Sequence, residues 1–145
     1  MNLKWLFILL SLPTATVALA HEDVENPTVK ARMMAMTAIV ENMKTLGRMA
    51  NGAVDFDLEQ AKAALVDIER TAKTVPKLFK SDEMHPKSEA LPVIWTNFAD
   101  FTAKAEALEG ASTKALASFS GKNDLIPSMR VLGGTCKACH SIYRK

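Results

Sequence analysis

The sequence predicts an all-α protein that folds as an antiparallel four-helix bundle. Apolar residues recur at intervals of three and four through most of the chain, a spacing that places them on one face of a helix. Only six Gly and six Pro occur among 145 residues, whereas a β-sandwich or barrel needs frequent turns. Four amphipathic segments joined by short connections, in a chain of this length, favour a bundle around a single core.

Residues 1–20 are expected to be a secretory signal peptide and therefore no part of the fold. Lys4 precedes an apolar run that Pro13 interrupts, and Ala18-Leu19-Ala20 has the small residues of a cleavage site. The run is shorter than the roughly 20 residues of a membrane anchor. We therefore expect export to the periplasm, cleavage after Ala20, and a mature domain over residues 21–145 without a membrane span.

The first helix is expected to begin at Asn26-Pro27, because Asn is a preferred capping residue and Pro suits the first helical position. It should end before Asn51-Gly52, a pair typical of turns. The spacings of four, three, four and three along its apolar face are those of a bundle seam. The predicted seam consists of Val29, Met33, Met36, Val40 and Met43.

The second helix is expected to start near Asp55 or Asp57 and to stop near Pro76, since proline interrupts a helix interior. A polar loop over residues 80–87 should follow it. The apolar face of this helix consists of Leu58, Ala61, Leu65, Ile68 and Ala72.

The third helix is expected to run from about Glu89 towards Ser120, with Pro92 in its first turn and Gly121 capping its C-terminus. The last helix should open at Asn123. The third helix is expected to run through Trp95, Phe98, Thr102, Ala105 and Leu108. One face of the last helix should carry Leu125, Met129, Leu132, Cys136 and Tyr143.

The last helix also carries the run Cys136-Lys137-Ala138-Cys139-His140, and C-x-x-C-H is the attachment signal for c-type haem. Thiols three residues apart stand about one helical turn apart, so both can form thioethers with one porphyrin. His140 follows Cys136 by four residues and shares its face, where its imidazole can reach the iron. We expect one covalent haem c, held by Cys136 and Cys139, with His140 as the proximal iron ligand.

Three other interpretations of the cysteine pair must be weighed. A redox-active dithiol normally lies at a helix start behind a strand, whereas this pair lies late in a helix. Half of a zinc site would need further ligands, and neither His21 nor His85 is well placed to supply one. An inert local disulfide in an oxidising compartment stays open.

The net charge of the chain and the distribution of its basic residues indicate which classes of partner it is suited to bind. A net charge of +2 gives no support for nucleic-acid binding, which usually shows a clearly basic patch. Lys137, Arg144 and Lys145 form a basic cluster beside the haem motif. Such a cluster is suited to steering an acidic redox partner, and a merely solvated C-terminus explains it equally well.

A haem motif on the last helix of an exported bundle resembles the cytochrome c′ family, the class II c-type cytochromes. Weaker points of resemblance are Gly133, Ile94-Trp95 and the run from Val29 to Arg32. The resemblance implies an electron carrier of the periplasm that exchanges single electrons with redox partner proteins and is not an enzyme. It is also compatible with a homodimer formed through the first two helices.

The resemblance further implies how the distal side of the haem is built. In this family the distal residue comes from the first helix, four positions after an arginine, and here Arg32 plus four is Met36. A methionine at this position implies low-spin, six-coordinate iron, and the arginine then contacts a haem propionate. Met33 is the alternative ligand, and methionines are also common core fillers.

Two further points depend on the same pocket. Phe79 and Trp95 are expected to wall the haem, although aromatic residues in a bundle are core residues by default. Without a methionine ligand the protein would instead be a five-coordinate haem protein that binds nitric oxide or carbon monoxide.

Overall fold

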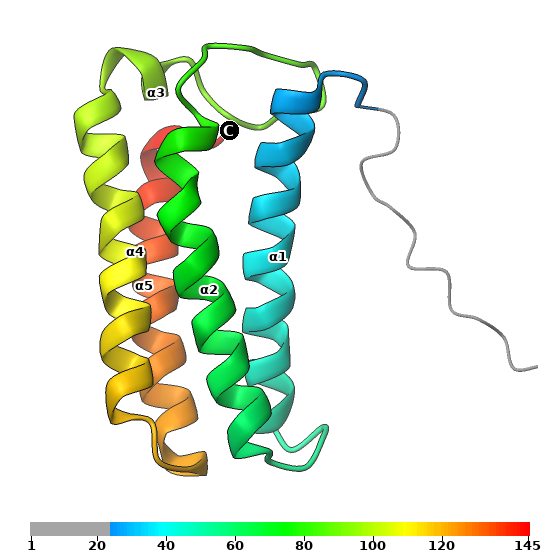
Figure 1. Ribbon diagram of the computed structural model, residues 1–145, viewed down its shortest axis with the longest axis vertical. Coiled ribbons are helices and arrows are strands. Elements are labelled where there is room, and N and C mark those ends of the chain that lie inside the picture. The colour runs from blue at the N-terminus through cyan, green and yellow to red at the C-terminus, as the bar shows by residue number, and fades with distance from the viewer. Residues whose placement is uncertain (1–23) are drawn as a thin grey trace, which may run out of the picture.

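The computed structural model describes residues 24–145, so the predicted signal peptide, its cleavage site and His21 lie outside the described residues. Four long helices run alternately up and down (Figure 1): α1 (Pro27–Ala50), α2 (Leu58–Leu78), α4 (Phe98–Ser118) and α5 (Leu125–Tyr143). Residues 24–145 contain no strand beyond an isolated β-bridge between Ala90 and Arg144. The prediction of an all-α, antiparallel four-helix bundle is confirmed.

The helix starts follow the predicted capping signals. The Asn26 side chain accepts a hydrogen bond from the Val29 N–H (3.0 Å), and the Asp57 side chain accepts one from the Gln60 N–H (2.9 Å). Gly52 has a φ of 76°, a left-handed conformation that glycine adopts without cost. The turn between α1 and α2 therefore has the geometry that its sequence predicts.

The predicted stop of the second helix near Pro76 is confirmed, since Pro76 lies in the last turn of α2 and the helix ends at Leu78. The predicted boundaries of the third helix are wrong. The predicted third helix is divided into α3 (Val93–Thr96) and α4, because Asn97 between them leaves the helical region with φ −129° and ψ 45°. Residues 89–91 before α3 are not helical and instead lie beside the C-terminal end of the chain.

The connection into the last helix also differs from the prediction. The C-cap of α4 is Phe119 rather than Gly121, whose φ of −176° is extended. Asn123 lies in a 3₁₀ helix, η1 (Lys122–Asp124), and α5 begins after it. The Asp124 carboxylate accepts hydrogen bonds from the Ser120 and Gly121 N–H groups (2.8 and 3.0 Å), so this turn is held by a side chain and not by a glycine conformation.

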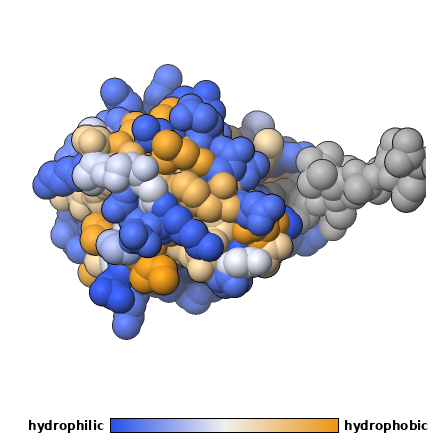
Figure 2. Space-filling view, turned by 90° about the horizontal axis from the view of Figure 1, so that it is seen from below, coloured by the Kyte–Doolittle hydropathy of each residue, from blue (hydrophilic) through white to orange (hydrophobic). Residues whose placement is uncertain are grey.

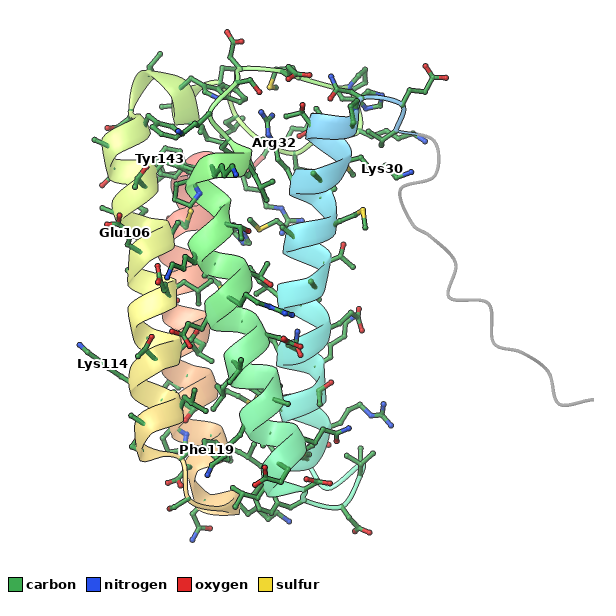
Figure 3. All side chains as sticks on the ribbon, viewed as in Figure 1. Lys30, Arg32, Glu106, Lys114, Phe119 and Tyr143 are labelled. Carbon is green, nitrogen blue, oxygen red and sulfur yellow. The ribbon has the colours of Figure 1, made fainter. Side chains whose placement is uncertain are left out.

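The bundle core consists of two apolar clusters, one towards each end. The larger cluster surrounds Leu65 and Leu132 near the α1–α2 turn, where Phe119 closes the end of the bundle (Figure 3). The smaller cluster surrounds Phe101 and Tyr143 near the C-terminus. Figure 2 views the molecule from the end that holds the α1–α2 turn, where hydrophobic residues lie between hydrophilic ones.

The seam of α1 is shifted from its prediction. Its buried or partly buried members include Arg32 and Ile39 alongside Met36 and Met43, whereas Val40 is 47% exposed. The prediction failed at Arg32 because a charged residue was not expected to hold a core position. With Arg32 included, the spacing of three and four continues without interruption.

Arg32 is 2% exposed and joins α1 to the loop after α2. Its Nε donates to the Leu78 carbonyl (2.8 Å), its Nη1 to the Glu83 carbonyl (2.6 Å) and its Nη2 to the Ser81 carbonyl (2.6 Å). The guanidinium also lies 4.8 Å from the ring centre of Phe79. Burial lowers the pKa of Arg32, and Glu83 and Asp82 oppose that shift.

Replacing Arg32 with Lys is expected to lower the free energy of unfolding by about 1–3 kcal/mol, measured by urea denaturation. A lysine ammonium cannot present the fork of donors that reaches three carbonyls, and buried acceptors left without a donor are costly. Arg70→Lys is the matched control, because Arg70 makes an exposed pair with Asp67 one helical turn away, and its effect should stay below about 0.5 kcal/mol. Equal effects of the two substitutions would contradict the anchoring role.

Candidate functional site

A cavity of about 790 Å³ opens between α1 and α5, with α2, α4 and residues 87–90 completing its wall. Among neighbouring helices, α1 and α5 pack least closely, and this separation makes the room. The volume lies within the range of about 300–1,000 Å³ that is usual for ligand pockets. Side chains from both core clusters, among them Ile39, Val75 and Phe101, make the cavity largely apolar.

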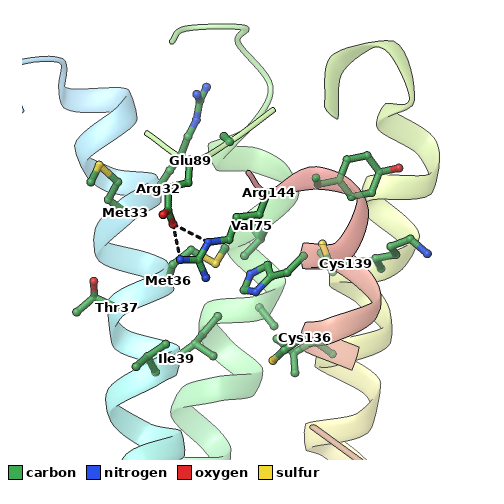
Figure 4. Close-up of a pocket in the computed structure, with 18 of the residues that line it drawn as sticks. Arg32, Met33, Met36, Thr37, Ile39, Val75, Glu89, Cys136, Cys139 and Arg144 are labelled. Atoms are coloured by element: carbon green, nitrogen blue, oxygen red, sulfur yellow. Dashed lines mark hydrogen bonds and ion pairs between the residues drawn. The ribbon is translucent and has the colours of Figure 1, made fainter. Parts of the chain in front are cut away.

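The three residues of the haem motif all line this cavity from α5 (Figure 4). Cys136 and Cys139 are half-buried free thiols on successive turns. Burial raises the pKa of both thiols, whereas a reactive dithiol has a lowered pKa at a helix N-terminus. Residues 24–145 contain no group of three or more His, Cys, Asp or Glu side chains that could hold a metal ion. The arrangement therefore favours thioether attachment over the dithiol and zinc interpretations.

His140 lies half-buried in the same wall. Burial is the main cause that lowers the pKa of its imidazole; nearby Arg144 lowers it further, and Glu89 raises it. Near neutral pH the imidazole is therefore held in its neutral form, which is the form that ligates metals.

The opposite wall is α1, and it brings Met36 to the cavity. Met36 packs against the smaller core cluster, and Figure 4 shows its side chain directed into the space that faces α5. Met33 also contributes to the lining, but its sulfur is directed away from α5 in the same view. Of the two methionines considered from the sequence, the structure places Met36 in the better position to meet a group held by α5.

The cavity wall carries an excess of positive charge, which suits a ligand that bears carboxylates. Five of its residues are cationic and two are anionic: Arg32, Lys44, Lys87, Lys104 and Arg144, against Glu41 and Glu89. Lys44 is paired with Glu41 (2.7 Å), and Arg144 is paired with Glu89. A haem brings two propionates into such a site, so the apolar interior and the cationic wall both fit it.

The remaining residues predicted to lie around the haem differ in whether they line the cavity. Phe79 lines the cavity. Trp95 is not among the lining residues; its ring lies 5.4 Å from the Arg32 guanidinium and its Nε1 donates to the Phe79 carbonyl (2.8 Å). Arg32 touches the cavity, but its guanidinium is directed to the carbonyls of the loop after α2. Its predicted contact with a propionate stays a prediction.

Sequence reasoning missed the contacts that hold the end of α5. Tyr143 is 2% exposed; its hydroxyl donates to Asp100 Oδ2 (2.6 Å) and its ring stands edge-on to Phe101 (5.3 Å between centres). Arg144 Nε donates to Glu89 Oε2 (2.6 Å). These partners are 43 and 55 residues apart in the chain, so no local motif could have signalled them. Together they fix the helical turn that presents His140.

The tyrosine hydroxyl is expected to titrate about two pH units above its ordinary value. Burial and the hydrogen bond to Asp100 raise the pKa of Tyr143 to about 12, against about 10 in an unfolded chain. The contribution to stability is then complete below pH 10 and is lost as the pH rises towards 12. Because the chain has one tyrosine, tyrosinate absorbance reports this group alone, and a midpoint near 10 in the folded protein would contradict the contact.

Comparison with known proteins identifies relatives of the whole chain. The family model described as Cytochrome C' matches residues 27–144. Cytochrome c-556 from Agrobacterium tumefaciens (strain II Chrys) is 36% identical over 121 residues, covering 80% of this chain and 95% of that protein. Cytochrome c' from Pararhodospirillum photometricum is 32% identical, covering 81% and 95%.

The fold agrees with solved structures as well. An NMR-validated structural model of oxidized R. palustris cytochrome c556 superposes with a TM-score of 0.76 at 27% identity, covering 82% of this chain and 96% of that one. Because the family match spans nearly all of the described chain and includes the cysteine pair, the chain belongs to the cytochrome c′ family, as a mono-haem c-type cytochrome with one covalently bound haem c.

Proposed function

We propose that the protein is a low-spin carrier of single electrons whose iron is held between His140 and Met36. The observation that carries this proposal is the direction of Met36, which points from α1 into the cavity that His140 lines from α5. When bound, the haem supplies one-electron chemistry, and the protein supplies its ligands, its orientation and its surroundings.

Each residue has a distinct task in this proposal. His140, held neutral, donates a ring nitrogen to the iron, and Met36 donates a soft thioether that raises the reduction potential. Cys136 and Cys139 hold the porphyrin covalently, so a small bundle can retain it. An iron held by both side chains would have no open site for a substrate, which would suit electron transfer and not catalysis.

Location and assembly belong to the same proposal. Residues 1–20 act as a signal peptide cleaved after Ala20, and the mature protein works in the periplasm with redox partner proteins. No helix within residues 24–145 is long and apolar enough to cross a bilayer. Intact mass of the purified protein tests the cleavage point directly, and sedimentation at several concentrations tests for the homodimer.

The decisive experiment is the absorption spectrum in both oxidation states, with and without carbon monoxide. The proposal expects low-spin spectra in both states, a weak band at the red end in the oxidised protein, and slow or absent carbon monoxide binding. A high-spin spectrum with rapid binding would replace the electron carrier with the gas-binding alternative. Haem released into acid acetone would contradict covalent attachment.

A further inference from the structure

The last helix and the two residues that follow it contain positive charges but no acidic residue. Residues 125–145 contain four Lys or Arg and no Asp or Glu, whereas residues 24–124 contain thirteen Lys or Arg against fourteen Asp or Glu. Arg144 is paired with Glu89, but Arg130 and Lys137 form no ion pair with any described residue. Both are exposed, and being seven residues apart they lie in one row, two turns from each other.

The same side of α5 also exposes apolar area. Val131 and Ile142 are 57% and 42% exposed. Between them lie exposed Gly134 and Ala138; glycine has no side chain and alanine only a methyl group, so the surface there is nearly flat. We call seven of the exposed residues on this helix the α5 outer face: Ile126, Arg130, Val131, Gly134, Lys137, Ala138 and Ile142.

The α5 outer face is the reverse side of the cavity wall. Lys137 and Ala138 separate the two cysteines in the sequence, and they are exposed where the cysteines turn inward. An α-helix with its side chains is about 10–12 Å across. A protein docked on this face would therefore lie about one helix diameter from the cavity that holds the haem.

We propose that the α5 outer face is the docking surface for a redox partner protein whose contact surface has an apolar centre rimmed by carboxylates. This inference rests on the proposed electron-carrier function, because it assigns the partner of the same site. Carboxylates complement Arg130 and Lys137 and speed the encounter. Val131 and Ile142 supply the apolar centre that a specific interface needs.

Two other occupants fit less well. A second copy of the chain would set one cationic face against another, which costs free energy. A helix that lies on an anionic membrane presents a broad apolar side with aromatic anchors, whereas the α5 outer face contains no Phe, Tyr or Trp.

The test uses the haem-loaded protein and gold electrodes coated with thiols that end in carboxyl groups, in methyl groups, or in a mixture of both. The mixed coating presents carboxylate and apolar end groups side by side, so electron exchange with the unmodified protein should be fastest there. The double variant Arg130→Glu/Lys137→Glu should slow exchange on the mixed coating about tenfold or more. Val131→Ser/Ile142→Ser should abolish the advantage of the mixed coating over the carboxyl coating.

The matched control is Lys62→Glu/Lys77→Glu on α2. It changes the net charge equally, and α2 lies diagonally across the bundle from α5. Its exchange rate should remain within about twofold of the unmodified protein, because screening limits the reach of an exposed charge to about 10 Å. Equal losses in the two double variants would overturn the docking surface, since net charge alone would then explain them.

Four further outcomes would also overturn the proposal. If the protein binds anionic phospholipid vesicles through Arg130 and Lys137 and shows no preference for the mixed coating, the α5 outer face is a membrane-binding surface. Self-association that the same variant abolishes would assign it to a second copy. If small neutral mediators also fail to oxidise the reduced protein, the electron-carrier function itself is wrong. If the mediators oxidise the protein normally but the protein shows no preference among the coatings, only the docking surface is wrong.

Discussion

The Met36→Leu variant is expected to have high-spin iron that binds carbon monoxide readily. Leucine has no lone pair for the metal, so the distal position would open while the cavity keeps nearly the same volume. A swap of this kind costs less than about 1.5 kcal/mol of stability, so the variant should fold and load haem. Absorption spectra in both oxidation states, with the rate of carbon monoxide binding, measure the change.

The control for this prediction is Met33→Leu, one turn earlier on the same helix. Because the Met33 sulfur is directed away from α5, this variant should keep the low-spin spectrum. If the two results were exchanged, Met33 would be the ligand. If neither substitution altered the spectrum, methionine ligation from α1 would be wrong.

Replacing both cysteines, Cys136→Ala and Cys139→Ala, is expected to abolish covalent haem and to destabilise the fold. A haem in the cavity between α1 and α5 would fill much of that space, so its loss would leave a large apolar void, and voids of this kind cost several kcal/mol. Haem staining after denaturing electrophoresis measures attachment, and thermal unfolding followed by circular dichroism measures stability. Each single variant should keep one thioether and an intermediate stability.

Ser141→Ala serves as the control, because Ser141 is exposed on the same helix and its hydroxyl bonds only to the Ala138 carbonyl (3.3 Å). It should keep both covalent haem and stability. Covalent haem in the double cysteine variant would contradict attachment at this motif. Unchanged thermal stability in haem-free protein would show that the core does not depend on the cofactor.

The sequence predicted the parts of this structure that local patterns encode. Periodic apolar residues identified the four long helices, and capping residues located the starts of α1 and α2. The break at Asn97 was missed, because the segment around it has helix-compatible composition and its backbone departs from the helix only in the folded chain.

In the functional site, too, the local signal was predicted and the long-range contacts were not. The haem motif is a local signal, and its three residues do line one cavity. The hydrogen bonds from the buried Arg32 guanidinium to a loop about 50 residues away were not predicted. Interactions of that range depend on how the helices pack, and a single sequence carries no mark of them.

The pairing of the chain's last residues with residues 89–91 bears on how the protein can be handled in the laboratory. The Lys145 N–H donates to the Glu89 carbonyl (2.9 Å) and the Leu91 N–H donates to the Tyr143 carbonyl (3.0 Å). An affinity tag fused directly after Lys145 would pull on the turn that presents His140. A spacer of Gly and Ser, which behaves as flexible coil, would separate the tag from that turn. Purification tags that follow such a spacer are therefore preferable when the spectrum is to be taken as native.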